Sequence, residues 1–117
     1  MTAIPAVVID AVRRRSHGTC EGCGVREATE MHHRQFRSRG GQHSVANLLH
    51  LCGWGNHTGC HGIAHSQAGH DKGWSVQSWA VPTAIPIQHA AHGLVLLDDV
   101  GRWAPAQKEA GPWAFAE

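Results

Sequence analysis

The apolar positions that follow Pro5 predict one short amphipathic helix at the start of the chain. Apolar side chains recur there at helical spacing, and proline is favoured in a first helical turn. The predicted helix ends near Arg15, with Arg13 and Arg14 beside it. These arginines fit either a solvated helix end, which the helix dipole favours, or a contact with phosphate.

Two strands are predicted next, joined by a long loop. Residues 25–31 carry few breakers and lead into His32 and His33, and a second apolar segment occupies residues 45–51. Gly40 and Gly41 lie between the two segments and indicate a turn or wide loop. The pattern therefore favours a hairpin whose first strand ends at a histidine pair.

A second helix is predicted from Cys60, with Gly69 as its stop signal. It places His61 and His65 one turn apart on the same face, where two imidazoles can hold one ion. His57 is a competing ligand, but it lies in a glycine-rich segment without a helical partner.

The last part of the sequence changes to strand patterns at residues 74–81 and 93–99, followed by a turn into a last short strand at Trp103. We expect one α+β domain over residues 1–117, with its core at about 20–68 and a short C-terminal β extension at about 73–104.

Composition adds a structural metal to this picture. A chain of 117 residues with 42% hydrophobic residues builds a small core, which usually needs a metal or disulfides as a staple. Eleven histidines are more than such a core would use, so some are expected to bind metal or transfer protons. Cysteines in a Cys-x2-Cys pair and a wider pair are expected to bind zinc in a reducing compartment, with disulfides as the alternative: Cys20, Cys23, Cys52 and Cys60.

The remaining polar residues suit cleavage of a phosphodiester. That reaction needs a base for the attacking water and a cation for the leaving oxygen. Adjacent strand residues point to opposite faces, so His32 can face an ion held with His61 and His65 while His33 faces the water. Asn47 is either the residue that ties the loop and fixes His33 or an ordinary turn residue.

Charge indicates where an anion would bind. The net charge is only +1, but the arginines gather in the first third of the chain. Arg34, Arg37 and Arg39 follow the histidine pair and are candidates for phosphate contacts that ignore base identity, with a solvated loop as the alternative.

Together these residues resemble an HNH endonuclease with a ββα-metal core. The resemblance covers about residues 20–65 and rests on the four cysteines, the histidine pairs, Gly40-Gly41 and Asn47-Leu48-Leu49. The tandem histidines are similar to those of nuclease colicins, and the cysteines to those of zinc-bearing HNH proteins of bacteria and phages. The stretch from Leu51 to Gly62 is similar to small phage HNH proteins, some of which work beside the packaging terminase.

The resemblance implies roles for these residues. His33 would be the general base, Asn47 the loop-fixing residue, and His32, His61 and His65 the ligands of a catalytic divalent ion. Many family members have Asp at the position of His32, so Mg²⁺, Mn²⁺, Ni²⁺ and Zn²⁺ all remain candidates. The expected substrate is DNA, either nicked or cut in both strands, and a phage terminase is a candidate partner.

Two other classes remain open on the sequence. One is a zinc-stapled DNA-binding module without catalysis, which would need zinc only. The other is a redox protein, which the absence of a βαβ pattern around Cys20 opposes. With no signal peptide and no stretch near the roughly 20 apolar residues of a membrane span, we expect the cytoplasm of a bacterial or phage-infected cell and no membrane partner.

Overall fold

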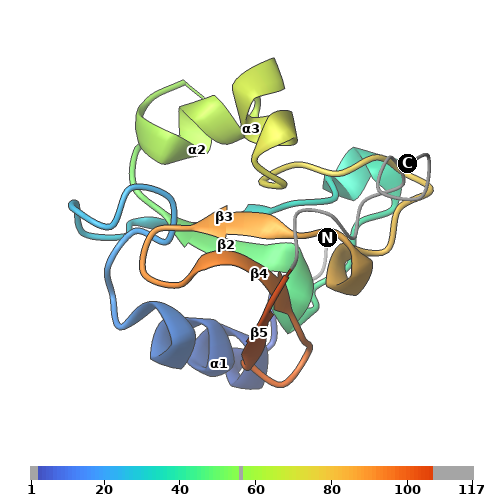
Figure 1. Ribbon diagram of the computed structural model, residues 1–117, viewed down its shortest axis with the longest axis horizontal. Helices are drawn as coiled ribbons and strands as arrows, with labels where there is room; N and C mark the ends of the chain where they lie inside the picture. The colour runs from blue at the N-terminus through green and yellow to red at the C-terminus, as the bar shows by residue number, and fades with distance from the viewer. Residues whose placement is uncertain (1–2, 56, 107–117) are drawn as a thin grey trace.

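The computed structural model describes residues 3–55 and 57–106, in which three α-helices surround two small antiparallel sheets (Figure 1). One sheet pairs β1 with β2, and the other has the order β3-β4-β5. The predicted α+β class is confirmed. The elements are α1 (Ala6–Ser16), β1 (Glu30–His33), β2 (Leu48–Leu51), α2 (Gly59–Ala64), α3 (Gln67–Asp71), β3 (Ile87–His89), β4 (Gly93–Leu97) and β5 (Trp103–Pro105).

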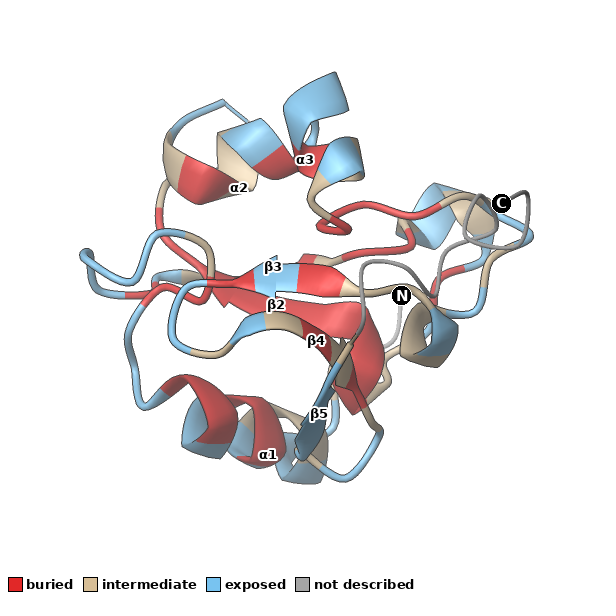
Figure 2. Ribbon diagram, viewed as in Figure 1, coloured by how far each residue is buried: buried red, intermediate tan, exposed pale blue. Residues whose placement is uncertain are grey.

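Strand β2 lies at the centre of the molecule, and all four of its residues are buried (Figure 2). Its side chains alternate between two apolar clusters, as strand geometry requires. Leu48 packs with Val12 of α1, whereas Leu49 and Leu51 pack with residues of α2 and of the second sheet. In Figure 1, α1 therefore lies on one side of β2, and α2 on the other.

The register of β1 on β2 determines which way the histidine pair points. His32 is opposite Leu49 and His33 is opposite Leu48. His32 therefore shares the face of β2 that packs toward α2, and it is 1% exposed. His33 lies on the other face and is only half-buried.

The predicted N-terminal helix is confirmed as α1, and the predicted strand around 93–99 is confirmed as β4. The helix predicted from Cys60 to Gly69 is instead two short helices. Ser66 begins the second one by accepting a hydrogen bond from the Gly69 N–H. Gly69 therefore does not end a helix but lies inside α3. Glycine is required there, because a Cβ would come within 2.3 Å of the Ile63 carbonyl oxygen.

The prediction of a strand over residues 74–81 is wrong. Only Val76 forms a ladder contact, an isolated parallel bridge to Gln35. The Gln35 side-chain amide donates to the carbonyls of Gln77 and Ala80, each at 2.9 Å. Side chains thus take the acceptors that a neighbouring strand would otherwise use. Within the described residues, no helix has the length and apolar character needed to cross a membrane.

Candidate metal centres

Four cysteines from three separate segments converge at the C-terminal end of β2. Their Sγ atoms all lie within 4.8 Å of one another, and the thiols are free. The Sγ atoms of Cys23 and Cys52 are 4.0 Å apart. Tetrahedral zinc with Zn–S bonds of about 2.3 Å requires sulfurs about 3.8 Å apart, so the cluster has the dimensions of a Cys₄ zinc site.

Backbone N–H groups are directed at these sulfurs. Cys20 Sγ accepts from the N–H groups of Gly22, Cys23 and Cys52 at 3.4, 3.5 and 3.2 Å, and Cys52 Sγ accepts from that of Cys60 at 3.4 Å. Such contacts stabilise thiolates, which are the form that binds zinc.

Seven residues separate Cys52 from Cys60 in sequence, but Gly53 and Gly59 beside them lie in contact. A Cβ on Gly53 would lie 2.1 Å from the Thr58 carbonyl oxygen, and one on Gly59 would lie 2.7 Å from the Gly53 Cα. Both glycines also have positive φ, at 103° and 61°. The close approach of two glycines thus brings the flanking cysteines to one point despite their wide spacing.

The ionisation of the thiols also fits a cation. Burial raises the pKa of the Cys20 thiol, and it raises that of Cys60, where the charge of the neighbouring cysteines adds to the effect. For Cys23, burial is outweighed by hydrogen bonds, led by that from the Arg26 backbone, and the pKa falls to about 6. Four such neighbours can all be thiolates only if a positive ion offsets their repulsion.

A second cluster joins β1 to α2. His32, His61 and His65 each offer one ring nitrogen, and these atoms lie within 4.8 Å of one another. The ring centroids are 4.9 to 5.2 Å apart. His65 caps the C-terminal end of α2, so the break in the predicted helix leaves it close to His61. His57 lies outside this cluster.

Hydrogen bonds determine which ring nitrogen of His32 and of His61 carries the proton and which keeps its lone pair. The Trp74 carbonyl oxygen lies 2.6 Å from His32 Nε2, and Glu30 Oε1 lies 2.7 Å from His61 Nδ1. Both oxygens accept, so these nitrogens carry the protons. The lone pairs are then on His32 Nδ1 and His61 Nε2. Acceptors behind ligand imidazoles are typical of metal sites, because they orient the ring and increase its basicity.

Two of the three imidazoles, those of His32 and His65, are poor proton acceptors in this environment. Burial lowers the pKa of His32 to about 3, and the neighbouring histidines contribute further. Burial also lowers the pKa of His65, with His61 as the next cause. Neutral rings repel a cation less and keep a lone pair free. The cluster therefore fits a divalent metal better than it fits three protonated histidines.

His33 has a partner that the sequence did not indicate. Its Nε2 lies 2.9 Å from His43 Nδ1. Burial lowers the pKa of His33 to about 4, with additional effects from His43 and Arg37. The ring is therefore neutral at pH 7, and its Nδ1 is the nitrogen that remains for a substrate or water.

Asn47 is buried and spans the loop between β1 and β2. Its Oδ1 accepts from the Gln35 N–H at 2.7 Å, and its Nδ2 donates to the Gln35 and Gln42 carbonyls at 3.2 and 2.9 Å. His43 follows Gln42 directly. Asn47 thus ties both ends of the loop that carries the partner of His33, which is the geometry expected of a loop-fixing residue.

Arg34 does not have the surface position that its predicted role requires. It is completely buried, and its guanidinium donates to four backbone carbonyls at 2.8 to 2.9 Å. No face is left for phosphate, so the prediction that Arg34 contacts DNA is wrong. Its acceptors are Gly73, Ala46, Pro82 and Ile85, which lie on the core and on the C-terminal extension. Arg34 therefore links the core to the C-terminal extension through these hydrogen bonds.

Arg37 and Arg39 remain at the surface beside the histidine cluster. Arg37 is exposed and donates to the Gly41 carbonyl. The Cζ of Arg39 lies 4.4 Å from the Phe36 ring centroid, and Phe36 stacks on His65 at 4.7 Å with 15° between the planes. A continuous stack therefore connects the Arg39 guanidinium to the cluster.

Sequence reasoning missed three residues of these sites. Glu30 could have been found, because it precedes His32 by two positions and so shares its face of the strand. His43 and the Trp74 carbonyl had no such signal, since the fold brings them to the histidines from distant positions.

The fold and its two clusters define a small α+β domain with a four-cysteine site and a three-histidine site, either of which could hold a metal ion. Comparison of the chain with family models, curated proteins and solved structures finds no match.

Proposed function

We propose that the protein is a metal-dependent endonuclease of the HNH type, which hydrolyses DNA phosphodiester bonds. The observation that carries the proposal is the convergence of His32, His61 and His65, with hydrogen bonds that orient two of the rings. His33 follows His32 directly and is near enough to His61 for the charge of that ring to lower its pKa, after the larger effect of burial. The order β1, β2, α2 also agrees with the ββα-metal core implied by the sequence resemblance.

The three-histidine cluster would hold a divalent ion, which would neutralise the charge that develops on the leaving oxygen. Imidazole ligands suit Ni²⁺ and Zn²⁺ better than Mg²⁺, which prefers oxygen. The four-cysteine cluster would hold structural zinc.

His33 would accept the proton of the attacking water at Nδ1, because its Nε2 is engaged by His43. Its low pKa in the free protein is compatible with this role. A phosphodiester anion at the site would favour the protonated ring and raise that pKa toward neutrality. His43 and Asn47 would act as positioning residues.

DNA is the proposed substrate because cations and an aromatic ring border the cluster. Arg37 and Arg39 would bind phosphates beside the scissile bond, mainly through charge and without reading bases. By the resemblance to small phage proteins, the enzyme would act beside a packaging terminase in the cytoplasm of an infected bacterium.

The test is incubation of the zinc-loaded protein with supercoiled plasmid and each of Mg²⁺, Mn²⁺, Ni²⁺ and Zn²⁺, with and without chelator. Relaxed product indicates nicking, and linear product indicates double-strand cleavage. We expect His33→Ala to lose at least about a hundredfold in rate, as removal of a general base does, with unchanged zinc content. His57→Ala is the matched control and should cleave normally, because His57 is exposed and outside the cluster.

The competing function is a zinc-stapled DNA-binding module without catalysis. It predicts DNA binding with no cleavage under any metal and no second exchangeable ion. For the nuclease, replacing any one histidine of the three-histidine cluster by Ala should raise the metal concentration needed for activity, and added metal should partly restore the rate. His33→Ala should not be restored by metal. Equal and unrestorable losses at all four positions would contradict this division of roles.

A further inference from the structure

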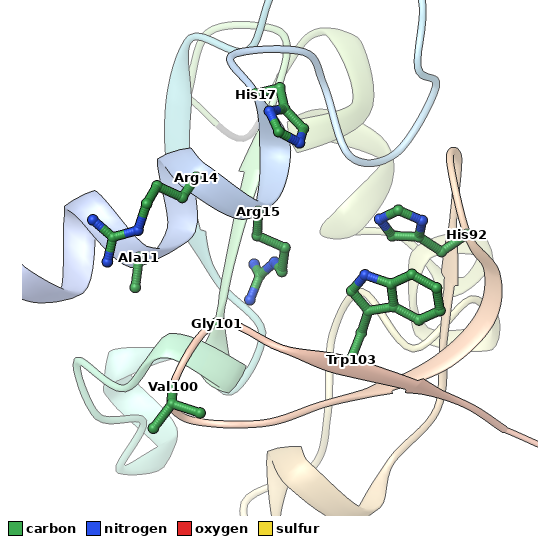
Figure 3. A pocket seen from close by; sticks show the side chains of 8 residues that line it. All are labelled: Ala11, Arg14, Arg15, His17, His92, Val100, Gly101 and Trp103. Atoms are coloured by element: carbon green, nitrogen blue, oxygen red, sulfur yellow. The ribbon is translucent and has the colours of Figure 1, made fainter.

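A small cavity lies between the C-terminal half of α1 and the turn that joins β4 to β5 (Figure 3). Its volume is about 230 Å³. The turn passes close to the helix, because a Cβ built on Gly101 would lie 3.5 Å from the Ala11 Cβ. The remaining wall carries basic and aromatic side chains, those of Arg14, Arg15, His17, His92 and Trp103.

The electrostatics of the cavity favour an anion. Among the residues that the structure describes, no carboxylate lines it. Arg15 is already paired with Glu21 at 2.7 and 2.9 Å, so neither contributes net charge. Arg14 and His17 are exposed, and their side chains make no hydrogen bond or ion pair with another described residue. Burial lowers the pKa of His92, and the cationic groups around it contribute further.

An aromatic column forms one side of the cavity. His92 stacks on Trp103 at 4.0 Å with 16° between the planes, and His89 stacks on His92 at 4.5 Å and 18°. His89 Nε2 lies 2.8 Å from the buried Glu21 carboxylate, which anchors the inner end. The outer end is Trp103, which is 40% exposed and pairs with no described side chain other than His92.

We propose that this cavity binds one nucleotide unit, with its phosphate on Arg14 and His17 and its base against the exposed surface of Trp103. Guanidinium groups bind phosphate through paired N–H donors, and aromatic rings stack on any base. The volume is below the roughly 300–1,000 Å³ of pockets that enclose drug-sized ligands, so it suits one unit and not a run of strand.

The cavity is separate from both clusters. None of its lining residues belongs to the cysteine or histidine set. Figure 1 shows α1, which carries the two arginines of the cavity, Arg14 and Arg15, on the opposite side of β2 from α2. The bound phosphate is therefore not the scissile one, and the inference does not depend on the proposed nuclease activity. The unit could come from a free mononucleotide or from an unpaired 5′-end of a strand, because both present the same phosphate and base.

Calorimetric titration of the zinc-loaded full-length protein, without added divalent metal, tests the proposal. The probes are deoxyadenosine 5′-monophosphate, deoxyadenosine, inorganic phosphate and a short 5′-phosphorylated oligodeoxyadenylate. The variants are Arg14→Gln and Trp103→Leu. The matched control is Arg13→Gln, which removes a neighbouring exposed arginine of α1 that does not line the cavity.

We expect the monophosphate to bind more tightly than either of its parts. Arg14→Gln should lower the affinity for the monophosphate by about tenfold or more, as loss of a charged hydrogen bond does. Trp103→Leu should lower the affinity for the monophosphate by about tenfold but leave the affinity for inorganic phosphate unchanged. Arg13→Gln should bind normally.

The probes also identify the source of the nucleotide. Tighter, Arg14-dependent binding of the phosphorylated strand assigns the site to a strand end, and equal binding assigns it to a free nucleotide. Either result supports the site. No saturable binding of the monophosphate, equal losses in Arg13→Gln and Arg14→Gln, or no effect of Trp103→Leu would overturn it.

Discussion

Replacing Arg34 by Met should destabilise the protein far more than any change of a surface arginine. Methionine keeps much of the aliphatic length but removes the guanidinium. Of the four carbonyl oxygens that accept from the fully buried Arg34, that of Pro82 keeps a second donor, the Ile85 N–H at 3.3 Å, and the other three lose their only described donor. They belong to both the core and the C-terminal extension, so the substitution weakens the attachment between the two.

The magnitude follows from these contacts. A buried polar group that loses its partner costs about 1–3 kcal/mol. We take the lower end, because removal of the guanidinium also returns the cost of burying its charge, which is reflected in its pKa being lowered to about 9. The three carbonyls left without a donor then give a loss of about 3 kcal/mol in the free energy of unfolding, a large part of the 5–15 kcal/mol typical of a domain.

Urea unfolding followed by tryptophan fluorescence, at constant free zinc, measures this loss. For a domain of this size, Arg34→Met should melt about 10 °C or more below the parent protein. Amide hydrogen exchange should increase first in residues 73–85, which contain three of the four acceptors. Arg37→Met is the matched control, because Arg37 is exposed, and it should change stability by less than about 0.5 kcal/mol. A loss below about 1 kcal/mol in Arg34→Met, or equal losses in both variants, would refute the structural role of Arg34.

Four further predictions concern the metal clusters and the histidine pair. Cys23→Ser should lower zinc content and melting temperature together, since the binding energy of a structural zinc is folding energy, and full zinc with an unchanged melting temperature would remove Cys23 from the set. Glu30→Gln should weaken Ni²⁺ binding at the histidine cluster by about 10–100-fold without changing zinc content, and an unchanged Ni²⁺ titration would contradict the role of Glu30 behind His61. His43→Ala should lower the cleavage rate at unchanged metal affinity, with partial recovery in His43→Gln, and a normal rate in both would exclude His43 as a positioning residue. His32 titrates at about 3 in the folded protein and near 6.5 when unfolded, so the unfolded state takes up its proton first. Stability should therefore be complete above pH 6.5 and fall toward pH 3 by up to about 1.4 kcal/mol per pH unit, and an equally steep fall in His32→Asn would show that other groups cause it.

The sequence by itself determined the features that depend on short spacings. Strand alternation separates the faces of His32 and His33, and the tight turn of Cys20 and Cys23 lets two thiols converge, whatever the rest of the chain does. The first helix was also predictable, because apolar periodicity is a local property. These features required no knowledge of distant contacts.

The tertiary structure alone decided which polar residues face solvent and which are used inside. Arg34 and Arg37 are both arginines of one predicted basic segment, yet one is fully buried and the other exposed. Likewise, residues 74–81 have a strand pattern, but carbonyl oxygens of this segment accept hydrogen bonds from the side chains of Gln35 and Arg39.

His43 was identified as the partner of His33 only from the fold, because it lies in a loop with no local signal that places it beside that ring. Whether a charged or amide side chain binds a ligand, orients a neighbour or satisfies a buried carbonyl depends on which acceptors the folded chain brings to it. Residues distant in the sequence supply those acceptors. Local pattern therefore predicted the residues of the two clusters, and long-range packing decided what holds them in place.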